Sequence, residues 1–78
     1  MTPLPRASGK AVAGALERGG CALSHVWGSH FYCVQQGTPN LVVVPMHGNR
    51  VLPVGTLAAI LRQSGLSADE LVALLRAR

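Results

Sequence analysis

Acidic residues are scarce in this chain, which has three of them among 78 residues: Glu17, Asp69 and Glu70. A nuclease that uses two metal ions needs several carboxylates that converge on the metals. Asp69 and Glu70 fall instead where they would open a helix. A Ser-His-Asp triad meets the same shortage, because Asp69 is the only aspartate. The composition therefore disfavours both kinds of chemistry.

Long apolar runs and metal-binding spacings are also missing. The chain has no 18-residue apolar run and its first residues lack an apolar signal core, so we expect a soluble, cytoplasmic protein with no membrane partner. Cys21 and Cys33 are the only cysteines. Without a secretion signal they are interpreted as reduced and buried, with a bridge between neighbouring strands left open. No C-x-x-C or H-E-x-x-H spacing occurs, and we expect neither a metal site nor a cofactor.

Positive charge is in excess, with seven Lys and Arg, a net charge of +4 and a pI of about 10.1. Residues 1–66 carry five of these cations against Glu17, whereas residues 67–78 are balanced. A nucleic-acid footprint is therefore expected on the body of the domain, although a small excess of arginine also serves solubility. Charged residues make up 13% and apolar residues 49% of the chain, which predicts an exposed apolar patch for a protein partner.

The pattern along the chain predicts an N-terminal flexible arm over residues 1–7 and a single α+β domain over residues 8–78. We expect helices over 9–18, 53–64 and from 68 onward, and strands over 21–26, 30–36 and 41–44. Alternation would place Cys21, Leu23 and His25 on one face of the first strand. Four consecutive aliphatic residues in the third strand indicate burial on both faces. The order α-β-β-β-α-α suggests a three-stranded antiparallel sheet that is covered on one face.

His30, in the motif Gly28-Ser29-His30, begins the second predicted strand. Imidazole accepts and donates protons near neutral pH. In a domain with so few carboxylates, the chemistry that remains is metal-independent cleavage of RNA. The imidazole would remove the ribose 2′-hydroxyl proton, and the products would be a 2′,3′-cyclic phosphate and a 5′-hydroxyl end. Candidates for protonating the leaving oxygen or stabilising the phosphorane are His47, Tyr32, Arg50 and Lys10.

All three aromatic residues, Trp27, Phe31 and Tyr32, lie within six residues of one another and flank His30. Their rings could stack on unpaired bases. A strand pair normally packs its aromatic side chains inward, and we assign Phe31 to the core. Trp27, beside the turn glycine, is the ring that we expect to be exposed.

Several short motifs occur in a recognisable order: Ser8-Gly9-Lys10, Gly28-Ser29-His30, Val43-Val44-Pro45, Met46-His47-Gly48 and Gly55-Thr56-Leu57 through Ser67. With these motifs the chain resembles the HicA family of toxins from bacterial toxin–antitoxin pairs. The resemblance implies a double-stranded-RNA-binding-domain-like α-β-β-β-α fold, here with an extra C-terminal helix. It also implies endoribonuclease activity on mRNA, neutralisation by a HicB-like antitoxin, and His30 as the catalytic histidine.

The remaining site residues are expected to support this chemistry. His47 is a possible acid or phosphate contact, and the expected RNA-binding residues are Lys10, Ser29, Arg50, Trp27 and Tyr32. Two alternatives stay open: a non-catalytic RNA-binding module of the same fold, which reads shape and phosphates, and a protein-interaction domain whose apolar surface matters more than RNA.

Overall fold

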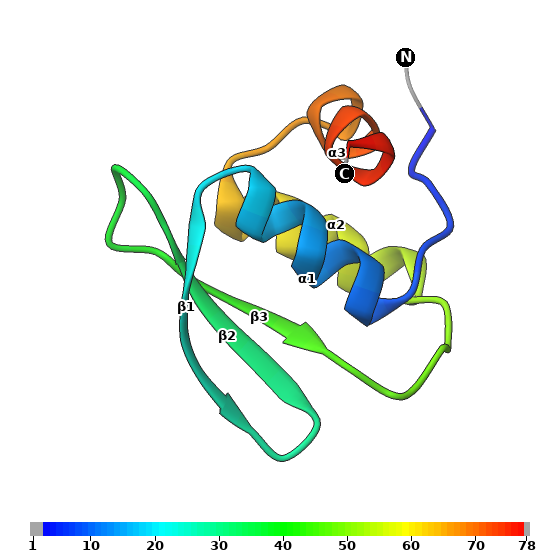
Figure 1. The fold of residues 1–78 in the computed structure, drawn as a ribbon. Helices are drawn as coiled ribbons and strands as arrows, with labels where there is room; N and C mark the ends of the chain where they lie inside the picture. Colours follow the sequence, from blue (N-terminus) through cyan, green and yellow to red (C-terminus); the bar gives the residue numbers. More distant parts are fainter. Residues whose placement is uncertain (1–2, 78) are drawn as a thin grey trace.

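A computed structural model describes residues 3–77 and has the predicted element order (Figure 1). The chain runs through α1 (Gly9–Arg18), β1 (Cys21–Trp27), β2 (His30–Gln35), β3 (Leu41–Pro45), α2 (Val54–Ser64) and α3 (Ala68–Arg76). The strands form one antiparallel sheet in the order β1-β2-β3. The α+β class and the α-β-β-β-α-α order are thereby confirmed. Among residues 3–77, none of the helices has the length and apolarity needed to cross a membrane.

The helix boundaries follow local chemistry. Ser8 caps α1 by accepting a hydrogen bond from the N–H of Ala11 at 3.1 Å. Gly65 ends α2 with a left-handed φ of 76°, a conformation that glycine adopts without a Cβ clash. At the start of α3, Ser67 and Glu70 exchange hydrogen bonds in a capping box. These boundaries match the predicted ones to within a residue.

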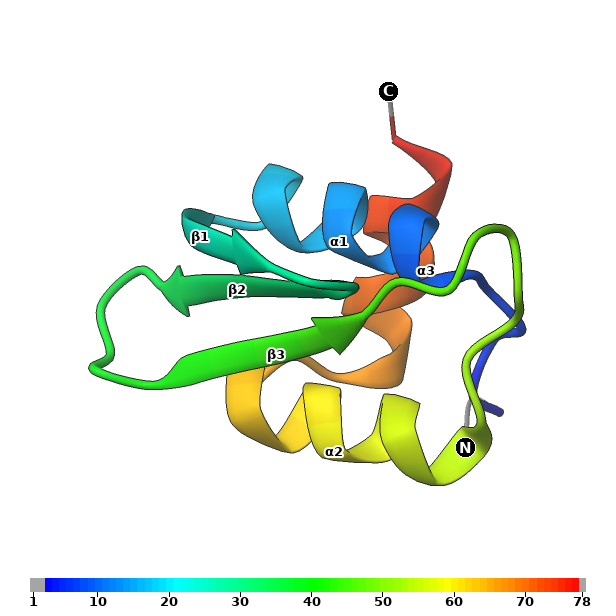
Figure 2. The same cartoon turned by 90° about the horizontal axis from the view of Figure 1, so that it is seen from below.

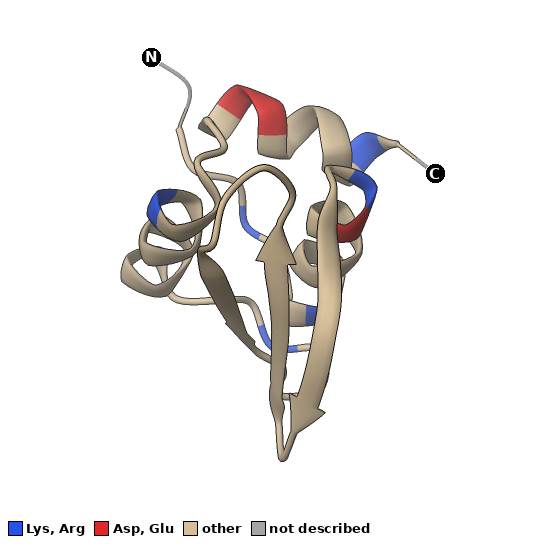
Figure 3. Ribbon diagram, turned by 90° about the vertical axis from the view of Figure 1, so that its left-hand side faces the viewer, with Lys and Arg blue, Asp and Glu red and all other residues tan. Residues whose placement is uncertain are grey.

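Both α1 and α2 lie on the same side of the sheet, and α3 packs against α1 at one end (Figures 1 and 2). The helix-facing side of the sheet holds the core residues Cys21, Phe31, Cys33, Val42 and Val44, all of them buried. The helices contribute Val12, Leu16, Leu57, Ile60 and Leu71. The opposite face of the sheet carries no helix (Figure 3). The sheet can therefore present one whole face and its ends to a ligand.

Two predictions about strand faces were wrong. The pairing of β1 with β2 contains a bulge between Leu23 and His25. Because a bulge adds one residue to a strand, His25 lies opposite Tyr32 on the open face, instead of sharing a face with Cys21. In β3, Val42 and Val44 are buried but Leu41 is 44% exposed and Val43 is half-buried, since no second layer covers the open face.

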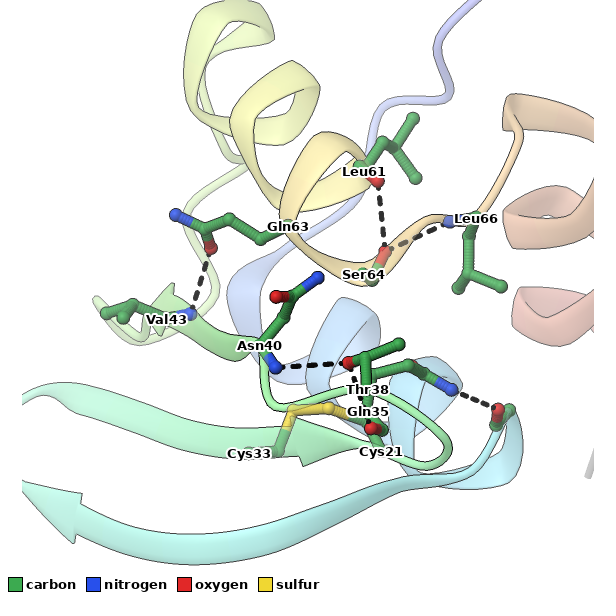
Figure 4. The surroundings of a disulfide bond; sticks show 11 residues. Cys21, Cys33, Gln35, Thr38, Asn40, Val43, Leu61, Gln63, Ser64 and Leu66 are labelled. Atoms are coloured by element: carbon green, nitrogen blue, oxygen red, sulfur yellow. Dashed lines mark hydrogen bonds between the residues drawn. A yellow bond between two sulfur atoms is a disulfide. The ribbon is translucent and has the colours of Figure 1, made fainter.

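The cysteine interpretation also needs correction. Cys21 and Cys33 are buried as expected, but they form a disulfide between β1 and β2 (Figure 4). They lie diagonally across the strand pair, since Cys21 is opposite Gln35 and Cys33 is opposite Leu23. Their Cα atoms are 5.5 Å apart, which is within the range that a disulfide spans. The bridge that the sequence left open is therefore the state seen in the structure.

The outer edge of β3 is covered and the outer edge of β1 is not. On β3, the N–H of Val43 donates to the side-chain oxygen of Gln63 on α2 at 3.2 Å (Figure 4). On β1, every residue after Cys21 is exposed. Three large apolar side chains of β1 are among them: Leu23, Val26 and Trp27.

The described part of the N-terminal arm lies against the domain. Leu4 and Ala7 are partly buried against the core, and the carbonyl of Ala7 accepts a hydrogen bond of 2.8 Å from the N–H of Leu52. Ser8 forms an isolated bridge with Val51. Met1 and Thr2 of the arm, and Arg78 at the other terminus, lie outside the described residues. The flexibility of residues 1–7 stays a prediction.

Candidate active site

His30 is the first residue of β2 and sits directly after the turn that joins β1 to β2. Gly28 in this turn has a φ of 59°, which favours glycine because a Cβ is strained there. Across the sheet His30 pairs with Trp27 on one side and with Pro45 on the other. Its side chain is half-buried. The imidazole is therefore held at the end of the middle strand and remains accessible.

His47 reaches the same end of the sheet from the segment that follows β3. The N–H of Met46 donates to the carbonyl of Ser29 at 2.6 Å, and a turn closes from His47 to Arg50 at 3.2 Å. The first of these contacts attaches the segment to the β1–β2 turn, and the second closes the segment on itself. The ring centroids of His30 and His47 are 6.3 Å apart and the ring planes are close to perpendicular, at 82°.

The N-terminal end of α1 packs against this place. A Cβ built on Gly9 would overlap the carbonyl oxygen of Pro45, so only glycine allows the helix to approach β3 so closely. Gly9 is buried and the next residue, Lys10, is exposed. The close approach places Lys10, the next residue of α1, beside the end of β3.

A row of rings extends from His30 over the open face. The ring of Tyr32 lies 6.4 Å from that of His30, and His25 stacks on Tyr32 at 4.3 Å with an angle of 10° between the planes. His25 Nδ1 also shares a 2.9 Å hydrogen bond with the hydroxyl of Ser24. Trp27 is 74% exposed and Phe31 is buried, which confirms both predictions for these two aromatic residues.

A pocket of about 400 Å³ opens next to His47. Its polar side chains come from His47, Arg50 and Thr56, and its apolar walls are formed by Pro45, Val51, Leu52 and Pro53. Thr56 belongs to the first turn of α2, and the pocket thus lies between the end of β3 and the start of that helix. It contains no carboxylate.

The charge distribution leaves this end of the molecule without acidic groups. No Asp, Glu, Lys or Arg occurs from residue 19 to residue 49, and the strands in Figure 3 are accordingly free of charged residues. The acidic residues Glu17, Asp69 and Glu70 lie toward the end of the molecule opposite the β1–β2 turn (Figure 3). Glu70 is held there by the capping box, and Arg18 is also engaged at a distance from the site, donating to the carbonyl of Leu74.

Most of the predicted site residues converge. His30, Ser29, Trp27 and Tyr32 surround the start of β2, and His47 joins them from the next segment. Arg50 shares a pocket with His47, and Lys10 borders the site through its neighbour Gly9.

Two neighbours of the site were not foreseen from the sequence. His25 reaches Tyr32 only because of the bulge, for which the sequence gives no clear signal. Thr56 was visible within Gly55-Thr56-Leu57, but nothing in that motif indicates a pocket. Among residues 3–77, no group of three or more His, Cys, Asp or Glu side chains is placed to hold a metal ion.

Fold and site together define a small α+β domain with two imidazoles at an open sheet end that lacks acidic groups. Comparison with known proteins is consistent with this description. The family model described as the HicA toxin of bacterial toxin–antitoxin matches residues 9–66, which is well over half of the chain. The chain therefore belongs to the HicA toxin family. A search of curated proteins gave no match.

Proposed function

We propose that this toxin is a metal-independent endoribonuclease that cleaves mRNA by histidine acid/base catalysis. The observation that carries the proposal is the pair of accessible imidazoles, 6.3 Å apart, at one end of the sheet. Two rings at this separation can each place a nitrogen within about 2.6–3.2 Å of an oxygen of one phosphoryl group. Efficient acid/base cleavage of RNA uses two proton-transferring groups, one for the attacking oxygen and one for the leaving oxygen.

In this mechanism, His30 acts as the general base and His47 as the general acid. The His30 imidazole takes the proton of the ribose 2′-hydroxyl, and the 2′-oxygen attacks the adjacent phosphorus. The bond from phosphorus to the 5′-oxygen of the next nucleotide breaks, and that oxygen receives a proton from His47. The products are a 2′,3′-cyclic phosphate and a 5′-hydroxyl end. The nucleophile is the 2′-hydroxyl, which RNA has and DNA lacks, so DNA is not a substrate.

Arg50 and Lys10 supply the positive charge that the crowded phosphorane requires. Arg50 is exposed and shares the pocket with His47, and Lys10 borders the same end of the sheet. With no acidic residue between Glu17 and Asp69, nothing in the strands or their connections weakens the positive potential toward an approaching polyanion. Trp27, largely exposed opposite His30, offers a surface on which a base of single-stranded RNA stacks.

The partner we propose is a HicB-like antitoxin with an acidic and partly apolar surface. The support for it is the uncovered edge strand β1, where Leu23, Val26 and Trp27 are 52%, 61% and 74% exposed; Leu23 and Val26 lie on the helix-facing side of the sheet and Trp27 lies on the open face. Exposed apolar patches of this kind are typical of protein interaction sites. A partner bound along this edge that covers Trp27 would lie beside His30, which pairs with Trp27, and would block access to it. We expect the complex to be markedly more soluble than the free toxin, and equal solubility of the two would contradict this assignment.

The test of the activity uses the full chain and three histidine variants. Purified wild-type protein, His30→Ala, His47→Ala and His25→Ala are incubated with long RNA in excess chelator, and the ends of the products are analysed. We expect cyclic-phosphate ends from the wild type and His25→Ala, and rates reduced about 10²–10⁴-fold in the other two variants. His25→Ala is the control for the loss of an imidazole, because the ring of His25 stacks on Tyr32 and contacts neither His30 nor His47; its rate is compared at saturating RNA, so that any weaker binding through Tyr32 does not enter the comparison. Undiminished cleavage by His30→Ala would refute the mechanism.

A further inference from the structure

The pocket beside His47 contributes His47 and Arg50 to the proposed catalytic steps, but those steps do not use Thr56 or the apolar walls of the pocket. Its volume of about 400 Å³ falls in the range of small-molecule sites and is larger than one phosphate group requires. Pro45 is shared between the pocket and the surroundings of His30, since Pro45 lines the pocket and pairs with His30 across the sheet. A ligand bound in the pocket would therefore lie directly next to a phosphate group held between the two histidines.

The lining has the chemistry of a nucleotide site. Proline and valine side chains, from Pro45, Pro53 and Val51, form the apolar walls, against which the face of a base can pack. Arg50 contributes hydrogen-bond donors only, whereas the Thr56 hydroxyl both donates and accepts. The absence of a carboxylate from the lining disfavours a cationic ligand. A ligand with a flat ring, hydrogen-bond acceptors and negative charge fits these groups.

The proposed mechanism gives this nucleotide a direction along the RNA. His47 would protonate the 5′-oxygen that leaves, and this oxygen belongs to the nucleotide on the 3′ side of the cut. His47 lines the pocket and His30 does not. The nucleotide that carries the attacking 2′-hydroxyl would lie on the other side, at His30 and Trp27.

We propose that the pocket of His47, Arg50 and Thr56 binds the nucleotide immediately 3′ to the cleaved bond and selects a purine there. The inference rests on the proposed ribonuclease function. Both purines present the N7 acceptor to a guanidinium, and guanine adds O6. Pyrimidines have no N7 and a smaller ring to fill the space between the apolar walls. On the opposite side of the cut, Trp27 accepts any base, because every base has a stacking face.

Binding of mononucleotides tests the pocket without cleavage. Nucleoside 5′-monophosphates resemble the nucleotide 3′ to the cut, and their binding to the wild-type chain is followed by NMR at the backbone amides. We expect 5′-GMP and 5′-AMP to shift Val51 and Thr56 and to bind about tenfold more tightly than 5′-UMP and 5′-CMP. Equal affinity for purines and pyrimidines, or shifts confined to β1, would overturn the proposal.

Variants identify the side chains responsible. Arg50→Gln and Thr56→Val should each reduce purine affinity about tenfold, whereas Thr56→Ser should retain it because the hydroxyl is kept. Arg62→Gln is the matched control for charge, since Arg62 is also exposed but does not line the pocket. Thermal melting of each variant shows that it folds. If Arg62→Gln weakens binding as much as Arg50→Gln, the interaction is general electrostatics and the pocket is not a nucleotide site.

Cleavage mapping separates this proposal from the ribonuclease proposal. RNA with a randomised segment is cleaved, and the fragments with 5′-hydroxyl ends are sequenced. We expect purines in the first position of these fragments for the wild type and Arg62→Gln, and a loss of this preference in Thr56→Val. Cleavage without any preference at this position would refute purine selection by the pocket but would leave the proposed ribonuclease activity intact. Purine binding at Thr56 by a chain that cleaves no RNA would support the pocket as a nucleotide site and refute the ribonuclease.

Discussion

The ring centroids of His30 and His47 lie 6.3 Å apart at the end of the sheet, with the ring planes at 82°, although 17 positions of the sequence separate the two residues. Two contacts create this relationship. His30 pairs with Pro45 in the next strand, and the N–H of Met46 donates to the carbonyl of Ser29. The ends of β2 and β3 are thereby attached to each other, and a histidine is placed on each of them.

The division of roles between these histidines can be tested with leaving groups. A uridine 3′-phosphodiester with a p-nitrophenyl leaving group needs no proton from an acid but still needs a base. We expect His47→Ala to cleave this substrate at close to the wild-type rate, while His30→Ala remains about 10²–10⁴-fold slower. The measurement is the release of nitrophenolate. An equal loss in both variants would contradict the assignment of His47 as the acid.

Trp27 and Phe31 should respond in opposite ways to truncation. Because Trp27 is 74% exposed, Trp27→Ala should change the free energy of unfolding by less than about 0.5 kcal/mol. It should weaken the binding of single-stranded RNA by about 1–3 kcal/mol. Phe31 is 6% exposed, and Phe31→Ala should lower the free energy of unfolding by about 3–5 kcal/mol.

Urea unfolding and RNA titration in a His30→Ala background measure both effects of these substitutions. The background prevents turnover during the titration. RNA affinity that is unchanged in Trp27→Ala would exclude this ring from the binding surface.

Two glycines of α1 provide a matched pair. Alanine favours a helix over glycine by about 0.5–1 kcal/mol, and the space at Gly14 admits a Cβ with only the flexible end of Arg18 nearby. Gly14→Ala should therefore stabilise the protein by about that amount. Gly9→Ala should destabilise it by about 1–3 kcal/mol, since the Cβ would overlap the carbonyl of Pro45. Chemical denaturation measures the free energy of unfolding of both variants. A Gly9→Ala variant that is more stable than the wild type would contradict the close approach of α1 to Pro45.

Reduction of the Cys21–Cys33 disulfide should destabilise the domain. The bridge joins residues 12 positions apart, and closing a loop of this size restricts the unfolded chain by about 3 kcal/mol. We expect a loss of about 2–3 kcal/mol in the free energy of unfolding when reductant is added. The double variant Cys21→Ala with Cys33→Ala is the control, because its stability should not depend on reductant. A wild type that is equally stable with and without reductant would show that the bridge does not form.

Local patterns in the sequence were sufficient for the elements and their order. Serine caps and glycine terminators act within a few residues, so the bounds of α1, the end of α2 and the start of α3 follow from neighbours alone. The burial of Phe31 and the exposure of Trp27 also followed from the position of the turn. The motif Gly28-Ser29-His30 drew attention to the histidine that the structure leaves accessible at the start of β2.

Tertiary structure decided what depends on contacts between distant residues. The bulge that moves His25 onto the open face is a property of the register between two strands, and a single strand has no register. The disulfide formed because β1 and β2 bring two cysteines within reach, whereas composition left the bridge open. The approach of His47 to His30, and the pocket between β3 and α2, likewise arise from packing of separate elements. The sequence by itself determined which side chains were available, and the packing of the strands and helices decided which of them meet.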